Sequence, residues 1–283
     1  MIVLDVADHR DARVQADARG NFALPLPKFR GRIPLEFLKQ GFHPTVVSVA
    51  ARKEGRVRVE LASRAALDQL AQRLGISQGA SLGVVYGRAL RESGVPLEGL
   101  AVRLSGQSEG PIYFNEKGQP DRDLRATSRD GRFLFLNVQP GSANLDSELR
   151  GEAIVPVPLF IVPGGEFLQR DLVPVNGTIT GRVLQAMKGA GGAPLVGARV
   201  RIEGSSEWST SDSLGAFRLG PFKSSKGEPL PVIVSAASFQ NHRYQIEPGR
   251  EERRLYAFSA RYLSRSEEHT SELQSHHDLV CRL

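Results

Sequence analysis

The chain has 283 residues, a formal net charge of +6, 29 glycines and 17 prolines. Its arginines are scattered along predicted strands and form no basic block with interleaved aromatics, which argues against a nucleic-acid partner. Its only cysteine is Cys281, so a disulfide framework and a cysteine-based metal site are both excluded. No apolar run predicts a membrane-spanning segment, and the many turn residues favour an all-β architecture.

Residues 1–62 predict the back half of a β-module. A turn at residues 39–42 separates two of its strands, and residues 56–61 alternate charged and apolar side chains like a strand with one buried face. The other strand candidates are Val14 and residues 22–24, 33–38 and 45–50. No front half of the module precedes Asp17, so we expect a truncated module here.

Residues 63–74 predict the one helix of the chain. Ser63 suits its N-cap, and Gly75 suits the position after its end, where a positive φ is favoured. One apolar face is formed at helical spacing by Leu67, Leu70, Ala71 and Leu74. We expect residues 63–81 to link or brace two β-modules, and an interaction helix is the alternative.

One pattern of glycines, prolines and apolar residues occurs twice along the chain. The first matching pairs are Gly87 with Gly181, Arg88 with Arg182, Pro96 with Pro194, Gly99 with Gly197, Val102 with Val200, and Gly106 with Gly204. The pattern then ends on a hairpin in which Ser128, Gly131 and Phe133 match Asp212, Gly215 and Phe217. A self-match of this kind predicts an array of like modules.

The hairpin part of the pattern occurs a third time, at Asp17, Gly20 and Phe22. An acidic side chain three residues before a glycine suits a tight turn, because the carboxylate caps the turn backbone and the glycine takes a positive φ. We therefore expect Asp17 and Asp212 to be turn residues without a catalytic role.

This consensus resembles the carboxypeptidase regulatory-like module, a prealbumin-like β-sandwich that occurs in tandem in many secreted and envelope proteins. The resemblance rests on the Gly-x-Val/Leu strand, the Pro-Leu-x-Gly segment and the Asp-x-x-Gly-x-Phe hairpin. It implies tandem prealbumin-like or Ig-like β-sandwiches with one short linking helix. The implied parts are a truncated module at 1–62, a helical linker at 63–81, and modules at 82–176 and 177–264.

In the metallocarboxypeptidases this module is an appendage and not the catalytic domain. The resemblance therefore implies a sandwich with no active site, cofactor or metal of its own. It also implies a secreted or cell-envelope location for the protein.

Residues 265–283 are polar and lack the β-pattern of the preceding chain. They resemble the translation of one reading frame of a common sequencing-library adapter. We expect an artefactual, disordered tail, and a genuine polar tail is the alternative. If the tail is an artefact, its histidines and cysteine have no metal-binding or redox role; these are His269, His276, His277 and Cys281.

Two Gly-x-Ser-x-Gly matches centre on Ser77 and Ser108. A hydrolase nucleophile elbow needs a strand before the serine and a helix after it. Ser77 follows the predicted helix and Ser108 lies between two predicted strands, so we expect neither to be catalytic. His9, His43 and His242 are far apart in the sequence and have no carboxylates at ligand spacing, which predicts no metal site.

Four aromatic side chains are candidates for stacking on a sugar ring: Trp208, Tyr113, Phe114 and Tyr244. Trp208 lies in a polar hairpin, and its ring either is exposed or caps the edge of its own core. The core-edge interpretation is preferred because aromatic residues are usually substantially buried.

We therefore expect a non-catalytic structural or interaction array of β-sandwiches from a bacterial secreted or cell-envelope protein. Its partner would be a protein or a polysaccharide. A carbohydrate-binding module array is the alternative, because the wider fold resembles starch-binding-type sandwiches. A hydrolase is the last alternative, and it would require activity that disappears with Ser77→Ala.

Overall fold

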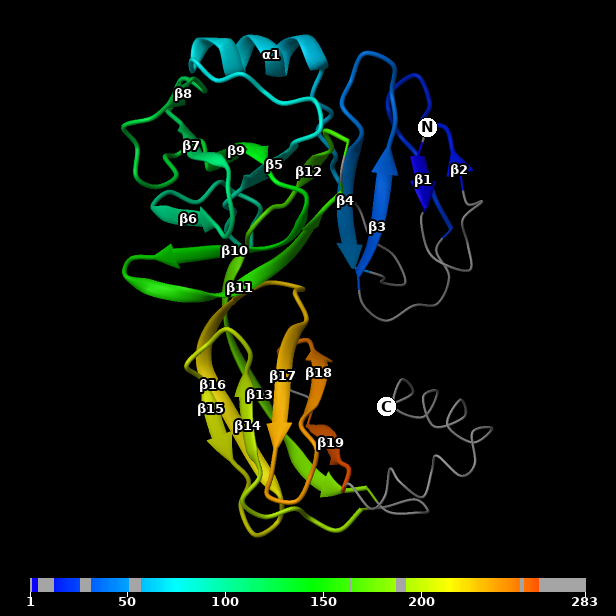
Figure 1. The fold of residues 1–283 in the computed structure, drawn as a ribbon, viewed down its shortest axis with the longest axis vertical. Coiled ribbons are helices and arrows are strands. Elements are labelled where there is room, and N and C mark those ends of the chain that lie inside the picture. The colour runs from blue at the N-terminus through cyan, green and yellow to red at the C-terminus, as the bar shows by residue number, and fades with distance from the viewer. Residues whose placement is uncertain are drawn as a thin grey trace. The chain divides into compact units, whose positions relative to one another are not determined.

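The computed structural model describes residues 2–4, 13–25, 32–50, 57–162, 164–186, 192–249 and 252–259. Within them the chain forms nineteen strands and one helix (Figure 1). The predicted all-β architecture with one short helix is therefore confirmed. The chain divides into two compact units, Met1–Val175 and Asn176–Leu283. His9 and the expected tail at 265–283 lie outside the described residues.

The first unit contains a nine-stranded sheet and a second layer of three strands. The nine strands are β1 (Ile2–Leu4), β2 (Arg13–Val14), β3 (Arg32–Phe37), β4 (Thr45–Ala50), β5 (Gly83–Arg88), β7 (Glu109–Phe114), β8 (Pro120–Asp121), β9 (Arg132–Val138) and β12 (Phe167–Gln169). They lie in the order β2-β1-β3-β4-β12-β5-β9-β7-β8. The second layer holds β6 (Leu100–Leu104), β10 (Gly141–Leu149) and β11 (Glu152–Ile161).

The strand β12 lies in the middle of the nine-stranded sheet and joins its two parts. It is hydrogen-bonded in parallel to β4 on one side and to β5 on the other. The β3–β4 hairpin therefore shares a sheet with the strands that follow the helix. The proposed division of this unit into residues 1–62, 63–81 and 82–176 stays a prediction.

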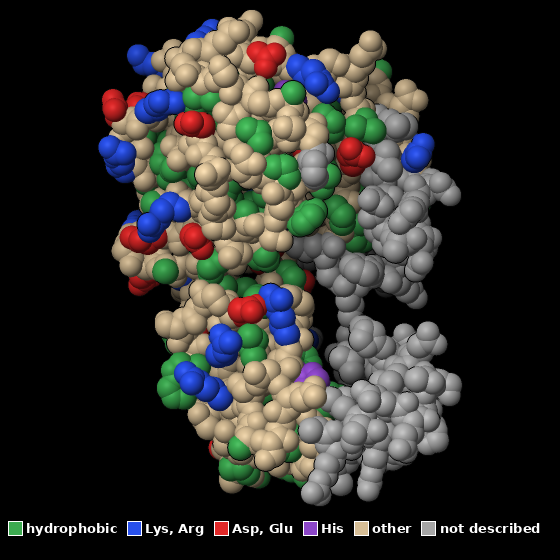
Figure 2. Space-filling model, in the orientation of Figure 1, with side chains coloured by type: hydrophobic (Ala, Val, Ile, Leu, Met, Phe, Trp, Pro, Cys, Tyr) green, Lys and Arg blue, Asp and Glu red, His purple; other side chains and the backbone are tan. Residues whose placement is uncertain are grey.

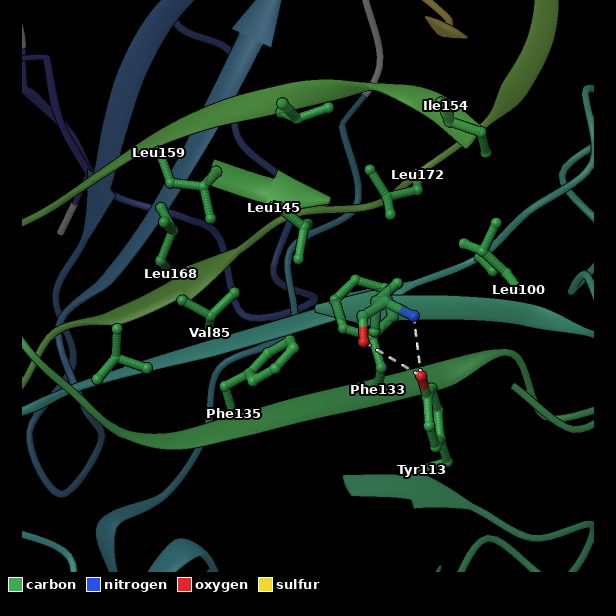
Figure 3. Close-up of a cluster of buried hydrophobic side chains, with 14 of the residues drawn as sticks. Val85, Leu100, Tyr113, Phe133, Phe135, Leu145, Ile154, Leu159, Leu168 and Leu172 are labelled. Atoms are coloured by element: carbon green, nitrogen blue, oxygen red, sulfur yellow. Dashed lines mark hydrogen bonds between the residues drawn. The ribbon is translucent and has the colours of Figure 1, made fainter. Parts of the chain in front are cut away.

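The core of the first unit lies between its two layers (Figure 3). Val85 and Phe135 face it from the large sheet, and Leu145 and Ile154 face it from the second layer. Each is at most 3% exposed. Burial of a large apolar side chain stabilises the folded state by about 1.5–3 kcal/mol, so the many side chains buried between the layers stabilise the unit.

The predicted helix is confirmed as α1 (Arg64–Arg73). Ser63 is its N-cap, and the hydroxyl of Ser63 accepts a hydrogen bond from the amide of Ala66 at 3.1 Å. Gly75 follows with φ +67°. Leu67 and Ala71 are buried against a second apolar cluster on β5, β7 and β9. The helix thus covers the outer face of the large sheet (Figure 1).

Two predicted strands of residues 1–62 are wrong. Residues 22–24 and the described part of 56–61 are irregular. Phe22 packs edge-on against Phe37, with ring centroids 5.4 Å apart. The backbone of the second segment bonds to a side chain instead of a strand: Glu60 N–H donates to Gln169 Oε1 at 2.9 Å. The alternation of charged and apolar residues in the second segment reflects partial burial of Val57, Val59 and Leu61, without hydrogen bonds to a neighbouring strand.

The second unit is a sandwich of a three-stranded and a four-stranded layer. The first layer has the order β19-β13-β16 and the second β15-β14-β17-β18. The bounds are β13 (Pro174–Gln185), β14 (Arg199–Ile202), β15 (Trp208–Thr210), β16 (Ala216–Ser225), β17 (Leu230–Ser235), β18 (His242–Ile246) and β19 (Arg253–Ala257). The core between the layers includes Val183, Val200, Phe217, Val232 and Leu255.

The sequence repeat is also a repeat of individual backbone hydrogen bonds. We call residues 83–172 repeat A and residues 176–257 repeat B. The matched donor–acceptor pairs are Ala89–Gly131 with Val183–Gly215, Leu97–Ala89 with Leu195–Val183, and Gly99–Thr127 with Gly197–Ser211. Their donor–acceptor distances are 2.7–3.0 Å. The recurring glycines and prolines therefore lie at equivalent points of two equivalent turns.

The predicted turns at the acidic residues are confirmed. Asp212 Oδ1 accepts from the amides of Leu214 at 2.9 Å and Ala216 at 2.8 Å, and Gly215 has φ +72°. Asp17 Oδ1 accepts in the same way from Arg19 and Asn21, both at 2.8 Å. These carboxylates are occupied by backbone amides, as expected for turn residues.

Candidate functional site

The most distinctive exposed feature of the second unit is the β14–β15 hairpin. β15 lies at the edge of the four-stranded layer and pairs there with β14 alone. Trp208 is its first residue, and 55% of this residue is exposed. The preferred core-edge interpretation of Trp208 is therefore wrong. Its ring is presented to solvent.

Two arginines on β14 flank the exposed ring. Val200 and Ile202 are fully buried, so the alternation of the strand turns Arg199 and Arg201 outward. Arg201 lies opposite Trp208 in the strand register, at the spacing where side chains touch. The guanidinium carbon of Arg199 lies 4.7 Å from the centre of the indole, within the range of a cation–π contact.

These side chains line an open depression of about 410 Å³. Its lining residues are Arg199, Arg201, Ser205, Ser206, Glu207 and Trp208. The turn is held by hydrogen bonds from Ile202 N–H to the carbonyl of Glu207 at 3.1 Å and from Glu207 N–H to Ser205 Oγ at 3.0 Å. A fixed hairpin thus presents an aromatic face, two guanidinium groups and hydroxyls together.

The lining of the depression has a net positive charge, because it holds two arginines and one glutamate. The neighbouring Arg243 is neutralised by Glu203, at 2.5 Å. For Arg199 and Arg201, no ion pair exists within the part of the chain that the structure describes. Elsewhere on the visible face of the molecule, basic and acidic side chains are interspersed (Figure 2). The depression therefore suits a ligand that combines a ring with a negative charge.

Tyr113 and Phe114 are core residues, so the prediction that they stack on a ligand is corrected. Both lie on β7, which pairs with β9, and they are 1% and 4% exposed. The hydroxyl of Tyr113 accepts from the amide of Val102 at 2.9 Å (Figure 3). Burial raises the pKa of the Tyr113 phenol. Phe114 is covered by Arg132, whose guanidinium carbon lies 4.4 Å from the ring centre.

Tyr244 is half-buried and ties β18 to β19. Its hydroxyl donates to the carbonyl of Tyr256 and accepts from the amide of the same residue at 2.9 Å. Burial raises the pKa of the Tyr244 phenol to about 12. Of the four aromatic candidates, only Trp208 presents most of its surface to solvent.

The serines of the two Gly-x-Ser-x-Gly matches lie in no nucleophile elbow. Ser77 follows α1 and precedes β5, and Ser108 lies between β6 and β7. The Nδ1 of His43 lies 3.2 Å from the carbonyl oxygen of Gly165. Among the described residues, no three His, Cys, Asp or Glu side chains are grouped to hold a metal ion.

An ion cluster in the first unit was not predicted from the sequence. Arg88 lies 3.1 Å from a carboxylate oxygen of Glu60 and 2.9 Å from one of Asp171. The hydroxyl of Tyr86 donates to Glu60 at 2.8 Å. Burial, followed by the bond to Glu60, raises the pKa of Tyr86, so the phenol stays protonated. The only signal in the sequence was that Arg88 belongs to the repeated Gly-Arg pair.

This cluster fits a structural role. Its two carboxylates are both paired with Arg88, and its phenol is a poor base because it is held protonated. It also fixes the irregular segment of residues 57–61 to the sheet, together with the contacts of Gln169. We therefore retain the depression at Trp208 as the candidate site.

Comparison with known proteins identifies no family. No family model matches the sequence, and no curated protein matches it. No described helix is long and apolar enough to cross a membrane. The structure has a low-level similarity to solved pilin subunits of Gram-positive bacteria.

Three of these structures illustrate the extent of the similarity. A streptococcal ancillary pilin is 12% identical, with 83% of this chain and 76% of that chain covered and a TM-score of 0.27. Shaft pilin SpaA of Lactobacillus rhamnosus GG is 8% identical, with 64% of this chain and 98% of that chain covered and a TM-score of 0.21. BcpA, the major pilin subunit of Bacillus cereus, is 12% identical, with 87% of this chain and 89% of that chain covered and a TM-score of 0.21. Similarity at this level does not extend to function.

Proposed function

We propose that the chain is a non-catalytic structural and interaction array of β-sandwiches, part of a bacterial secreted or cell-envelope protein. One observation supports this above the others. The residues that recur between repeats A and B make equivalent backbone hydrogen bonds in equivalent turns. A residue that is repeated because it shapes a turn has no need of a chemical role.

A reactivity assay tests the non-catalytic part of this proposal. The purified chain would be treated with a fluorophosphonate probe and with panels of ester and glycoside substrates. We expect no labelling and no turnover, because neither Ser77 nor Ser108 lies on the strand-to-helix turn that a nucleophile elbow requires. Labelling that Ser77→Ala or Ser108→Ala removes would contradict the proposal. Fractionation of cells that make the full protein tests its location, and a cytosolic pool alone would contradict it.

A second candidate function is supported by the exposed ring of Trp208. An aromatic face binds the C–H face of a sugar ring, and a guanidinium group binds a carboxylate through paired hydrogen bonds. Arg199 and Arg201 add this second capacity beside the ring. We propose that the depression binds an acidic saccharide, a sugar ring that carries a carboxylate.

Titration with an oligogalacturonate and with a neutral oligosaccharide of equal length tests this second function. We expect preferential binding of the acidic sugar, loss of binding in Trp208→Ala, and loss of the preference in the double variant R199Q/R201Q. Leu214→Ala is the matched control, because Leu214 is a 60% exposed apolar residue of the same unit outside the depression. If polyglutamate binds as tightly as the oligogalacturonate and Trp208→Ala has no effect, the site recognises negative charge alone, which would overturn the proposal.

A further inference from the structure

In each repeat, the strand by which the chain enters and the strand by which it leaves are direct neighbours. The chain enters repeat A through β5 and leaves through β12, and it enters repeat B through β13 and leaves through β19. Both pairs are parallel. The register runs from Val84–Phe167 to Tyr86–Gln169 in repeat A, and from Gly181–Arg253 to Gln185–Ala257 in repeat B. We call these two pairs the terminal pairs.

This arrangement determines how the repeats respond to tension along the chain. Tension pulls the start of the entering strand and the end of the leaving strand apart. In a parallel pair these two points lie at opposite ends, so the force acts along the strands. All the hydrogen bonds between the strands are then stretched together. In an antiparallel hairpin pulled at its open end, by contrast, the bonds break one after another.

The terminal pair of repeat A continues beyond β12. Its additional backbone bonds, all at 2.8 Å, run from Val84 to Glu166, Arg170 to Tyr86, Leu172 to Arg88, and Leu90 to Leu172. The side chain of Asp171 adds a bridge across the pair. It accepts from the backbone amide of Arg88 at 3.0 Å and from the guanidinium of Arg88 at 2.9 Å. β12 is also held by β4 on its other side.

The terminal pair of repeat B has the same parts. Five residue pairs are in register, and Ala186 N–H donates to the carbonyl of Ala257 at 2.8 Å. The guanidinium of Arg182, the counterpart of Arg88, donates to Glu252 at 2.8 Å. The second residue of the repeated Gly-Arg motif thus holds a carboxylate at the leaving strand in both repeats.

The first residue of the motif allows the leaving strand to approach. A β-carbon at Gly87 would lie 2.0 Å from the carbonyl oxygen of Arg170, and one at Gly181 would lie 2.3 Å from that of Arg253. Real contacts of this kind are essentially never shorter than 3.0 Å. The Gly-Arg motif is therefore a device for closing the terminal pair, and it recurs where that pair recurs.

We propose that the protein bears tension along its chain, and that the two terminal pairs are the elements that resist it. This inference rests on the proposed structural role and makes it specific: the array carries a mechanical load between its two ends. No ligand or reaction is needed for it. What it requires is that force enters and leaves through the ends of the repeats.

Single-molecule pulling in two directions tests the inference. In the first geometry, handles are attached to peptide tags at both ends of the chain. In the second, the C-terminal handle is moved to a thiol introduced by Gly249→Cys. Both geometries use a Cys281→Ser background, so that this thiol is the only one in the protein. Position 249 lies beside the start of β13, because Gly249 N–H donates to the carbonyl of Thr178 at 3.3 Å. A β-carbon added there meets no atom within 4 Å.

The second geometry leaves β19 unpulled, so the terminal pair of repeat B is no longer sheared. We expect the unfolding force of the second unit to fall at least about twofold, since forced unfolding follows the barrier along the pulled direction. Repeat A is pulled identically in both geometries and serves as the internal reference. The second unit is recognised by its release of roughly 80 residues in the first geometry and roughly 70 in the second, which are extensions of about 280 Å and about 250 Å.

Equal unfolding forces in the two directions would overturn the inference. That outcome would leave the non-catalytic array standing, because the latter is tested by reactivity and not by force. If Gly249→Cys lowers the thermal midpoint of the protein, Glu247→Cys, at an exposed position two residues earlier, provides the same geometry.

Discussion

Gly181 lies against the carbonyl oxygen of Arg253 so closely that a β-carbon on the glycine would be 2.3 Å from that oxygen. The contact is between two backbones, so no side chain can move aside to relieve it. We expect Gly181→Ala to destabilise the second unit by about 1–3 kcal/mol, the range of overpacked sites. Urea unfolding measures it. Gly249→Ala is the control and should be nearly neutral, because the space around Gly249 is empty. A fully stable Gly181→Ala would contradict the close approach.

A buried hydroxyl holds the second turn of each repeat. Ser211 Oγ donates to the carbonyl of Leu195 at 2.6 Å and accepts from Ala198 N–H at 2.9 Å, and Thr127 makes the equivalent bonds to Leu97 and Leu100. We expect Ser211→Ala to cost about 1–3 kcal/mol, because it leaves buried backbone groups unpaired.

The two repeats supply the control for this hydroxyl. Ser211→Thr should retain most of the stability, since repeat A carries threonine at the equivalent position. Chemical unfolding of the three proteins gives the comparison. If Ser211→Thr is as damaging as Ser211→Ala, the two turns are not equivalent.

Arg88 and Arg182 are equivalent in the repeat but differ in exposure. The side chain of Arg88 is 18% exposed between two carboxylates, whereas that of Arg182 is 48% exposed. Removal of Arg88 leaves the partly buried carboxylates of Glu60 and Asp171 without their cation. We therefore expect Arg88→Leu to lower the free energy of unfolding by up to about 5 kcal/mol. Arg182→Leu should cost about 1 kcal/mol or less, as for other surface ion pairs. Equal losses of unfolding free energy in denaturant titrations of the two variants would show that the Arg88 cluster stabilises the protein no more than a surface ion pair does.

His242 should make the second unit sensitive to acid. Its Nε2 is buried without a hydrogen-bond partner, and its ring lies 4.7 Å from that of Phe258 and 6.4 Å from that of Tyr244. Burial lowers the pKa of the imidazole, and no charged group contributes to the shift. The folded state therefore favours the neutral ring, while the unfolded chain gains a proton below about pH 6.5.

The consequence is a loss of stability as pH falls through that value. The His242→Phe variant, which cannot be protonated, should lose less stability than the wild type between pH 7.5 and 5.5. Thermal midpoints across this interval measure the difference. Parallel pH profiles would contradict the assignment to His242.

Much of the fold could be predicted because local signals and tertiary structure agree. Ser63 and Gly75 mark the ends of α1, and the alternation of Val200 and Ile202 marks a strand with one buried face. The failures have a physical cause. Residues 56–61 alternate like a strand, but their backbone partner is the side chain of Gln169, more than a hundred residues away. Such a partner leaves no trace in the local pattern.

The candidate site was predicted less well. Tyr113 and Phe114 were candidates for stacking on a ligand, whereas pairing of β7 with β9 buries both. Trp208 was expected at a core edge, but Val200 and Ile202 already fill the inner face of the hairpin. The role of Thr127 and Ser211 could not be seen either, because their bonds depend on turns that meet only in the folded chain.

The central claim is that the repeated residues build two equivalent hydrogen-bonded frameworks. Amide hydrogen exchange of the intact protein tests it most directly. The account predicts strong protection of the amides of Ala89, Leu97, Gly99 and Thr127, and matching protection of Val183, Leu195, Gly197 and Ser211. Rapid exchange of either set, with the other protected, would contradict it.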